Sequence, residues 1–200
     1  MSPIFLNKNI FKKEIVFFLI LYITLIISFI LGENSTGGAI GDYNQTKIAT
    51  RAFASDFFKT FNEYDTYGHR HSPVLIIFLS FFEKIKLPDI LLRLIHLHLC
   101  LILPFLFYKC LTIKFSTIDK KVFFFLSSLI FISPTFRSLA IWPDSRLLGL
   151  ILFTLSVYYF LKFEENKNFK FAILNVVTLA LSSYISPNFS VFSIFFFTKF

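Results

Sequence analysis

The feature that most constrains this chain is its series of long apolar runs, because most of its few charges lie between them. Of the 200 residues, 56% are hydrophobic and 31 are Phe, whereas only 16% are charged. A helix needs about 20 mainly apolar residues to cross the ~30 Å hydrocarbon core of a bilayer. So small a charged fraction also cannot cover a water-soluble core with a polar shell. We therefore predict an all-α, polytopic transmembrane helix bundle and exclude soluble enzymes, secreted modules and DNA-binding domains.

The lengths of these runs predict the membrane spans. The apolar runs lie at about 15–32, 88–108, 122–141, 147–163, 171–186 and 189–200. Lysines precede the first run as in a signal peptide, but the run has span length and no small-residue cleavage site follows it. We expect an uncleaved signal-anchor. The last run ends while still apolar, so we expect residues 1–200 to be one membrane domain from a longer protein.

The distribution of lysine predicts the topology. The stretch 73–82 has ten residues before the next charge, too few for a helix rising about 1.5 Å per residue to cross the bilayer. If this stretch does not cross, the lysines near the N-terminus and those at 109–121 and 162–170 all face one side. The positive-inside rule assigns that side to the cytoplasm. We predict a cytoplasmic N-terminus, in the inner membrane of a bacterium.

This topology places a long loop, 33–87, on the outer face of the membrane. Apolar residues recur every three to five positions within 43–62, which predicts an amphipathic helix lying on the bilayer. A second surface helix is predicted at about 73–86. The loop thus carries two interfacial juxtamembrane helices. Because topology explains the net charge of +8, we expect no nucleic-acid partner.

Two carboxylates, Asp42 and Asp144, are the main catalytic candidates. Asp42 follows the first run on the outer side, where a carboxylate could act as a general base on a hydroxyl or amine. From spacing alone, a role as N-cap of the surface helix is favoured. Asp144 lies in the turn Trp142-Pro143-Asp144, where it can cap the next span. Capping does not explain why the topology brings both carboxylates to one face.

Three arginines are candidates for binding an anionic group. Arg137 and Arg146 flank Asp144, and their planar guanidinium groups suit a phosphate, although both could equally anchor at the interface and pair with Asp144. Arg93 lies inside the 88–108 run, from which it could reach a head group or the carboxylate of Asp89. For the two histidines of this run we favour neutral, packed imidazoles.

A polar segment of the outer loop contains potential ligands for a divalent metal ion. The candidates are Glu63, His69 and His71. Imidazole and carboxylate groups suit such an ion or could contact a phosphate. Their spacing is loose, so a solvated loop is the favoured interpretation.

The order of these features resembles the N-terminal part of the GT-C superfamily of polytopic glycosyltransferases, which includes family 39 protein mannosyltransferases and aminoarabinose-transferase-like enzymes. Five elements carry the resemblance, over roughly residues 10–165: Gly41-Asp42-Tyr43, His71-Ser72-Pro73, Arg93-Leu94, Ser133-Pro134 and Pro143-Asp144. Two departures are Tyr43, where a second acidic residue is often found, and Ser72, where a proline is.

The resemblance implies transfer of a sugar from a polyprenyl-phosphate donor to a glycan, lipid or protein acceptor, with inversion, on the outer face. Asp42 would be the catalytic base and Asp144 would assist it. The donor would be bound by His71, Arg93, Arg137 and Arg146. Members of the superfamily are usually more than twice as long, so 200 residues alone are expected to be poorly active. Two alternatives stay open: a non-enzymatic membrane subunit or small transport component, and an enzyme similar to O-antigen ligases or polymerases.

Overall fold

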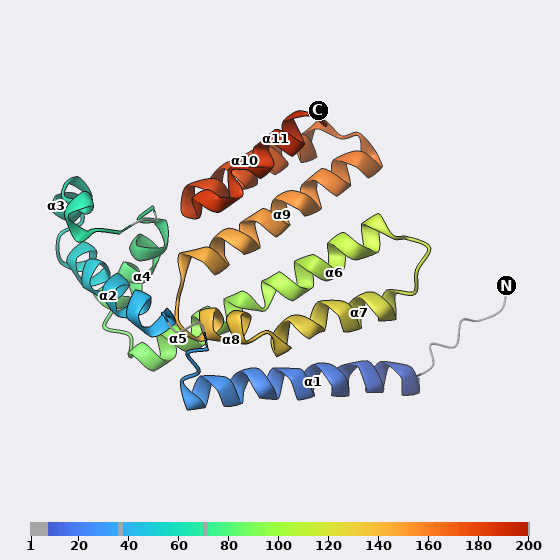
Figure 1. The fold of residues 1–200 in the computed structure, drawn as a ribbon, viewed down its shortest axis with the longest axis horizontal. Coiled ribbons are helices and arrows are strands. Elements are labelled where there is room, and N and C mark those ends of the chain that lie inside the picture. Colours follow the sequence, from blue (N-terminus) through green and yellow to red (C-terminus); the bar gives the residue numbers. More distant parts are fainter. Residues whose placement is uncertain (1–7, 36–37, 70–71, 200) are drawn as a thin grey trace.

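The computed structural model describes residues 8–35, 38–69 and 72–199, and every regular element in these ranges is helical (Figure 1). The prediction of an all-α chain is therefore confirmed. The elements are α1 Lys8–Leu31, α2 Ala39–Ser55, α3 Phe57–Asn62, η1 Tyr64–Tyr67, α4 Val74–Lys84, α5 Asp89–Cys100, α6 Ile102–Lys114, α7 Lys120–Ser128, η2 Leu129–Ile132, α8 Pro134–Ile141, α9 Ser145–Asn166, α10 Phe169–Ile185, η3 Pro187–Phe189 and α11 Phe192–Phe197.

Two helical segments of the described chain are long and apolar enough to cross a membrane. They are Asp89–Lys114, which joins α5 and α6 over 26 residues, and α9, which has 22 residues. The apolar part of α1, Ile15–Leu31, and α10 are shorter than this. Exposed large apolar side chains line both of them, including Ile20, Ile23 and Val176. These features agree with membrane association, while the total number of crossings stays a prediction.

The run at 122–141, which we predicted as one span, is bent in the structure and is either a broken span or a re-entrant segment. It divides into α7 with η2 and the separate helix α8, and the two parts meet at an angle of 68°. The Ser133 side chain accepts a hydrogen bond from Phe136 N and so caps α8, whose first residue is Pro134. Proline has no backbone N–H and cannot continue a preceding helix without losing a hydrogen bond. The sequence Ser-Pro therefore starts a new helix.

Two other predicted segments differ from the helices that the structure shows. The 189–200 run forms only part of η3 and the six-residue α11 within the described residues, so it is not a helix of span length. The predicted surface helix at 43–62 is two helices, because Asp56 adopts an extended conformation and its side chain caps α3 through Lys59 N. The second surface helix is present as α4.

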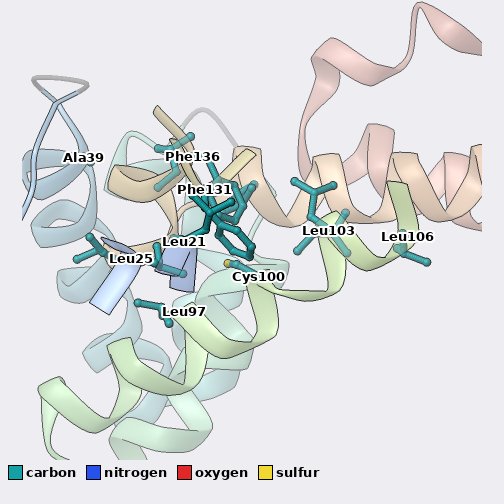
Figure 2. Packing of buried hydrophobic residues seen from close by; sticks show 14 residues of the cluster. Leu21, Leu25, Ala39, Leu97, Cys100, Leu103, Leu106, Phe131 and Phe136 are labelled. Atoms are coloured by element: carbon teal, nitrogen blue, oxygen red, sulfur yellow. The ribbon is translucent and has the colours of Figure 1, made fainter. Parts of the chain in front are cut away.

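The largest apolar cluster joins α1, α5, α6, α8 and α9, as Figure 2 shows in part. Leu25, Leu97, Phe131 and Ile141 have no exposed surface in this cluster. Between helices in a bilayer, such contacts stabilise the fold through close van der Waals packing, because lipid tails are as apolar as these side chains. In Figure 1, α2, α3 and α4 lie together at one end of the longer helices. Leu148 near the start of α9 packs against a cluster that includes Tyr43 of α2 and Leu75 of α4, so these two helices lie beside the start of α9.

Small and polar residues bring α9 and α10 close together. Ser182 Oγ donates a hydrogen bond of 2.8 Å to Gly149 O, and Asn175 Nδ2 donates to Ser156 O at 2.8 Å. A Cβ on Gly149 would lie only 2.7 Å from the Cβ of Ser186. Small residues of this kind allow close backbone approach between helices in membranes. This contact supports the start of α9, where the candidate site lies.

Candidate functional site

A polar cavity of about 420 Å³ lies between α2, the segment that precedes α4, and the start of α9. This volume is within the usual range for small-molecule sites. Its lining is formed by Asp42, Gln45, Thr46, Tyr64, Gly68, His69, Ser72, Leu75, Ile76, Asp144, Ser145 and Arg146. The cavity therefore contains both predicted catalytic carboxylates and one of the three predicted arginines.

Asp42 is not the N-cap of its helix, so that prediction is wrong. Helix α2 begins at Ala39, three residues earlier, with Gly38 as its N-cap. The backbone N–H of Asp42 donates to Gly38 O at 2.9 Å, which places Asp42 in the first turn. A carboxylate in the first turn is favoured by the partial positive charge of the helix N-terminus. The Asp42 side chain is 56% exposed and lines the cavity instead of capping α2.

Asp144 caps α9, as the sequence predicted. Its Oδ1 accepts a hydrogen bond of 2.7 Å from the backbone N–H of Arg146, and its side chain is only 8% exposed. Capping uses only part of its acceptor capacity, because a carboxylate has about four lone-pair positions. The same side chain therefore also contributes to the cavity.

Arg146 connects the two carboxylates. Its Nη2 donates to Asp42 Oδ2 at 2.8 Å and to Asp144 Oδ2 at 2.7 Å, and its Nε donates to Asp144 Oδ1 at 2.9 Å. The predicted meeting of Asp42 and Asp144 is thus present, with a guanidinium between them. When all three groups are ionised, the two carboxylates and the guanidinium together carry one net negative charge. The guanidinium is therefore fully compensated by its two partners.

The rest of the lining supplies neutral hydrogen-bonding groups. Gln45 and Thr46 lie three and four positions after Asp42, so one face of α2 presents all three to the cavity. That helical spacing could have identified them from the sequence. Ser72 Oγ is buried, and no hydrogen-bond partner for it is found within the described part of the chain. Burial raises the pKa of Tyr64 to about 12, so its phenol stays protonated.

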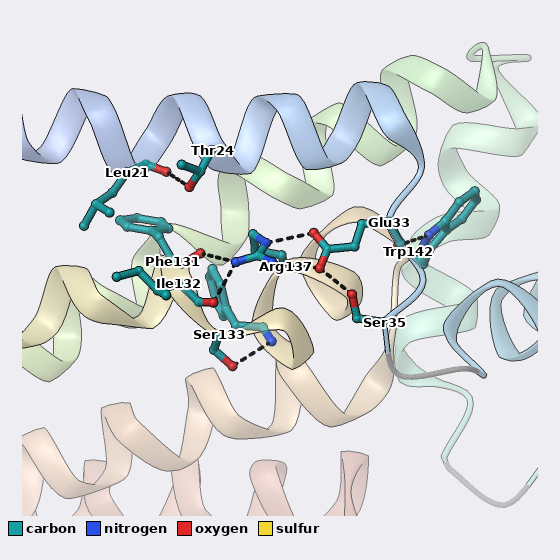
Figure 3. Close-up of polar contacts among 10 residues, drawn as sticks. Leu21, Thr24, Glu33, Ser35, Phe131, Ile132, Ser133, Arg137 and Trp142 are labelled. Atoms are coloured by element: carbon teal, nitrogen blue, oxygen red, sulfur yellow. Dashed lines mark hydrogen bonds and ion pairs between the residues drawn. The ribbon is translucent and has the colours of Figure 1, made fainter.

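Arg137 does not reach the cavity. Figure 3 shows its guanidinium against Glu33, with Nε 2.8 Å from Oε2 and Nη2 2.9 Å from Oε1. Its Nη1 donates to the carbonyl oxygens of Phe131 and Ile132. A bidentate pair of this kind leaves little donor capacity for a phosphate. Arg137 therefore joins the end of α1 to α8.

Glu33 is a structural residue that our sequence reasoning missed. The hydrogen bonds from Arg137, opposed by burial and assisted by hydrogen bonds from Ser35 and Ser28, lower the pKa of Glu33 to about 2. Trp142 Nε1 also donates to Glu33 O at 2.9 Å. No local signal in the sequence marks this partner, because it lies 104 residues from Arg137.

Arg93 also lies outside the cavity lining. Its guanidinium is 3.5 Å from the ring centroid of Trp142, and its Nε donates to Ile141 O at 3.1 Å. It forms no ion pair with Asp89, the partner we had considered. His96, one turn further along α5, is buried and its Nδ1 lies 2.9 Å from Ala140 O, in agreement with the packed imidazole that we predicted. The same prediction is wrong for His98, which is exposed and lies with its Nε2 2.7 Å from Tyr22 OH.

Asp89 is paired instead with α2. Tyr43 OH donates to Asp89 Oδ1 at 2.6 Å, and Lys47 Nζ lies 2.8 Å from the same oxygen. Burial and this hydrogen bond raise the pKa of Tyr43 well above its ordinary value, so the phenol stays protonated. Tyr43, which we noted only as a departure from the superfamily pattern, therefore holds α2 against α5 and fixes the position of its neighbour Asp42.

The predicted metal ligands are only partly described. His71 lies outside the described residues, and Glu63 is exposed at the end of α3. His69 lines the cavity, and its ring is stacked on that of Tyr64 with the two ring centroids 5.9 Å apart. Over residues 8–35, 38–69 and 72–199, no three His, Cys, Asp or Glu residues form a group suited to a metal ion. A divalent ion stays a prediction.

Comparison of the chain with models of protein families, with curated proteins and with solved structures found no match. The resemblance to polytopic glycosyltransferases therefore depends on the residues alone.

Proposed function

We propose that this protein is the N-terminal part of a membrane glycosyltransferase of the GT-C type, which transfers a sugar from a polyprenyl-phosphate donor to a glycan, lipid or protein acceptor. The observation that carries this proposal is the cavity in which Arg146 bridges Asp42 and Asp144. It combines a carboxylate that is open to solvent, a cation suited to phosphate and neutral groups suited to hydroxyls.

Asp42 is the general base in the proposed reaction. It accepts the proton of an acceptor hydroxyl, whose oxygen then forms a bond to the anomeric carbon of the donor sugar. The bond from that carbon to the phosphate oxygen breaks, and polyprenyl phosphate leaves with the bonding electron pair. Attack from the opposite side inverts the configuration. An exposed fraction of 56% leaves Asp42 accessible to an acceptor.

Arg146 donates a hydrogen bond to the phosphate that leaves, and Asp144 holds Arg146 in place. Asp144 is suited to this role because it is buried and contacts both Nε and Nη2 of the guanidinium. The Nη1 group of Arg146 forms none of the hydrogen bonds above, so it is available to a phosphate oxygen. Arg137 and Arg93 support the site through the fold and do not bind the donor.

The proposed orientation puts the cavity on the outer face of a bacterial inner membrane. In Figure 1 the cavity helices α2 and α4 lie at one end of the molecule, while the α6–α7 and α9–α10 connections lie at the other. Four lysines are in or directly beside these two connections: Lys114, Lys120, Lys121 and Lys167. The positive-inside rule favours a cytoplasmic location for the lysine-rich end. The polyprenyl tail would lie along the exposed apolar helices.

The test is sugar transfer from a labelled polyprenyl-phosphate donor, in membranes that contain the full native reading frame around this chain. Asp42→Asn keeps the shape and removes the base, so transfer should fall by about 10²–10⁴-fold. Asp65→Asn is the matched control, because Asp65 is an exposed carboxylate of the same loop that does not line the cavity. Unchanged transfer by Asp42→Asn at normal membrane abundance would refute the mechanism.

The donor also separates this proposal from an enzyme similar to O-antigen ligases. Transfer from a monophosphate-linked sugar supports the proposal, whereas transfer only from a diphosphate-linked glycan would support the ligase alternative. If no donor is used and Arg93 or His96 variants alone lose function, the protein is instead a transport component or a non-enzymatic subunit.

A further inference from the structure

A second cavity, of about 550 Å³, lies between α1, α6 and α7 and shares no lining residue with the candidate site. Its lining comprises Ile15, Phe18, Leu101, Pro104, Phe105, Tyr108, Asp119, Lys120, Lys121, Phe124, Ser127 and Ser128. Most of these side chains are apolar, and the charged ones all come from the start of α7. The cavity is thus an apolar groove with a charged mouth.

The walls of the groove are suited to a hydrocarbon chain. Phe18 and Phe124 pack with their ring centroids 6.2 Å apart, and Phe105 is 57% exposed. The hydroxyls of Ser127 and Ser128 both donate to Phe124 O, so they present no unsatisfied donor to the groove. A water-filled groove with such walls is unfavourable, whereas an acyl chain covers them without losing a hydrogen bond.

The mouth of the groove is cationic. Lys120 is exposed and Lys121 is half-buried, and both follow Asp119, the only carboxylate of the lining. Asp119 already accepts a hydrogen bond from Lys121 N as the cap of α7. Lys109 Nζ adds further positive charge, because it lies 5.3 Å from the ring centroid of Phe105 on the groove wall. The ammonium groups therefore outnumber the carboxylate.

We propose that this groove binds an anionic phospholipid, with one acyl chain between α1, α6 and α7 and the phosphate between Lys120 and Lys121. Charge complementarity selects this occupant over a zwitterionic lipid, whose choline would meet the lysines with a like charge. The location agrees as well, since lysines at the membrane surface attract anionic lipids. The site does not depend on the proposed enzymatic function, because it shares no residue with the catalytic cavity.

The experiment measures lipid binding to the purified full chain by native mass spectrometry after exchange into detergent micelles. Phosphatidylglycerol and phosphatidylcholine with the same acyl chains are the two probes. Each lysine near an anionic surface is worth about fivefold in affinity, so Lys120→Gln with Lys121→Gln should weaken phosphatidylglycerol binding about 25-fold. Phosphatidylcholine binding should change less than twofold. Both lysines are on the surface, so circular dichroism should find the variant folded.

The control is the pair Lys167→Gln and Lys170→Gln, which removes two exposed lysines outside the groove lining. This variant should retain at least half of the wild-type affinity. Equal loss in both double variants would overturn the proposal, since the attraction would then be a property of the whole basic surface. Equal binding of the two lipids by the wild type would also overturn it. Displacement by equimolar inorganic phosphate would overturn the lipid assignment, because a free anion would then suffice.

Discussion

The pair formed by Glu33 and Arg137 predicts a specific dependence of stability on pH. Its side chains are only 16% and 18% exposed, and the hydrogen bonds from Arg137, with smaller contributions from Ser35 and Ser28 and against the effect of burial, lower the pKa of Glu33 from 4.5 to about 2. Each pKa unit corresponds to about 1.4 kcal/mol, so the ionised form of Glu33 stabilises the fold by about 3 kcal/mol. We expect double-mutant cycles with Glu33→Gln and Arg137→Gln to give a coupling free energy of this size.

The direction of the pH effect follows from the lowered pKa. A carboxyl whose pKa is lower in the folded state contributes its full stability above its unfolded pKa and loses it as the pH falls through the folded value. The free energy of unfolding should therefore fall by about 3 kcal/mol more in the wild type than in Glu33→Gln between about pH 5 and pH 2. At pH 7, Arg137→Gln should be strongly destabilised, because it leaves a mostly buried carboxylate without its partner.

The assay is urea unfolding in non-ionic detergent micelles, followed by far-ultraviolet circular dichroism at several pH values. The control is Glu165→Gln, which removes an exposed partner from the pair with Lys162 three residues away on α9. Such surface pairs contribute about 0.2–0.5 kcal/mol. A coupling free energy below about 0.5 kcal/mol between Glu33 and Arg137 would refute the reasoning. It would also be refuted if the free energy of unfolding fell equally in acid for the wild type and for Glu33→Gln.

Three further predictions concern packing, positioning and capping. Gly149→Ala should lower the free energy of unfolding by about 1 kcal/mol, because the new Cβ is overpacked against Ser186 and this cost exceeds the gain in helix propensity. Gly41→Ala should raise the free energy of unfolding by a similar amount, because nothing lies within 4 Å of its new Cβ. Thermal unfolding measures both effects. Tyr43→Phe removes the 2.6 Å hydrogen bond to the carboxylate at the start of α5 and should cost about 1.5–3 kcal/mol, measured by the same unfolding assay. Asp144→Ala should cost at least ~1 kcal/mol through the lost cap of α9, whereas Asp144→Asn should retain the cap and most of the helical signal in circular dichroism.

Much of the secondary structure could be predicted because its causes are local. Apolar runs, proline and capping side chains act over a few residues, and the Asp144 cap of α9 was identified on that basis. Errors arose where two local signals compete. One helix ends and another begins at Ser133 and Pro134, inside a single apolar run. Asp56 likewise separates α2 from α3. Hydropathy alone does not detect either break, so it predicted one helix where the structure has two.

The sequence predicted the two carboxylates of the candidate site and, as one of two alternatives, the pair of Arg146 with Asp144, but not the ion pairs with distant carboxylates. Arg137 and Arg146 are both close to Asp144 in the sequence, which suggested the same role for both. In the structure each pairs with a carboxylate 104 residues earlier, Arg137 with Glu33 and Arg146 with Asp42. The sequence by itself determined the helices, the apolar surface and the presence of these charged groups, because propensity and hydropathy are properties of short segments. Only the tertiary structure decided which charges meet, because the energy of an ion pair depends on the distance between its atoms and on their burial, not on their separation along the chain.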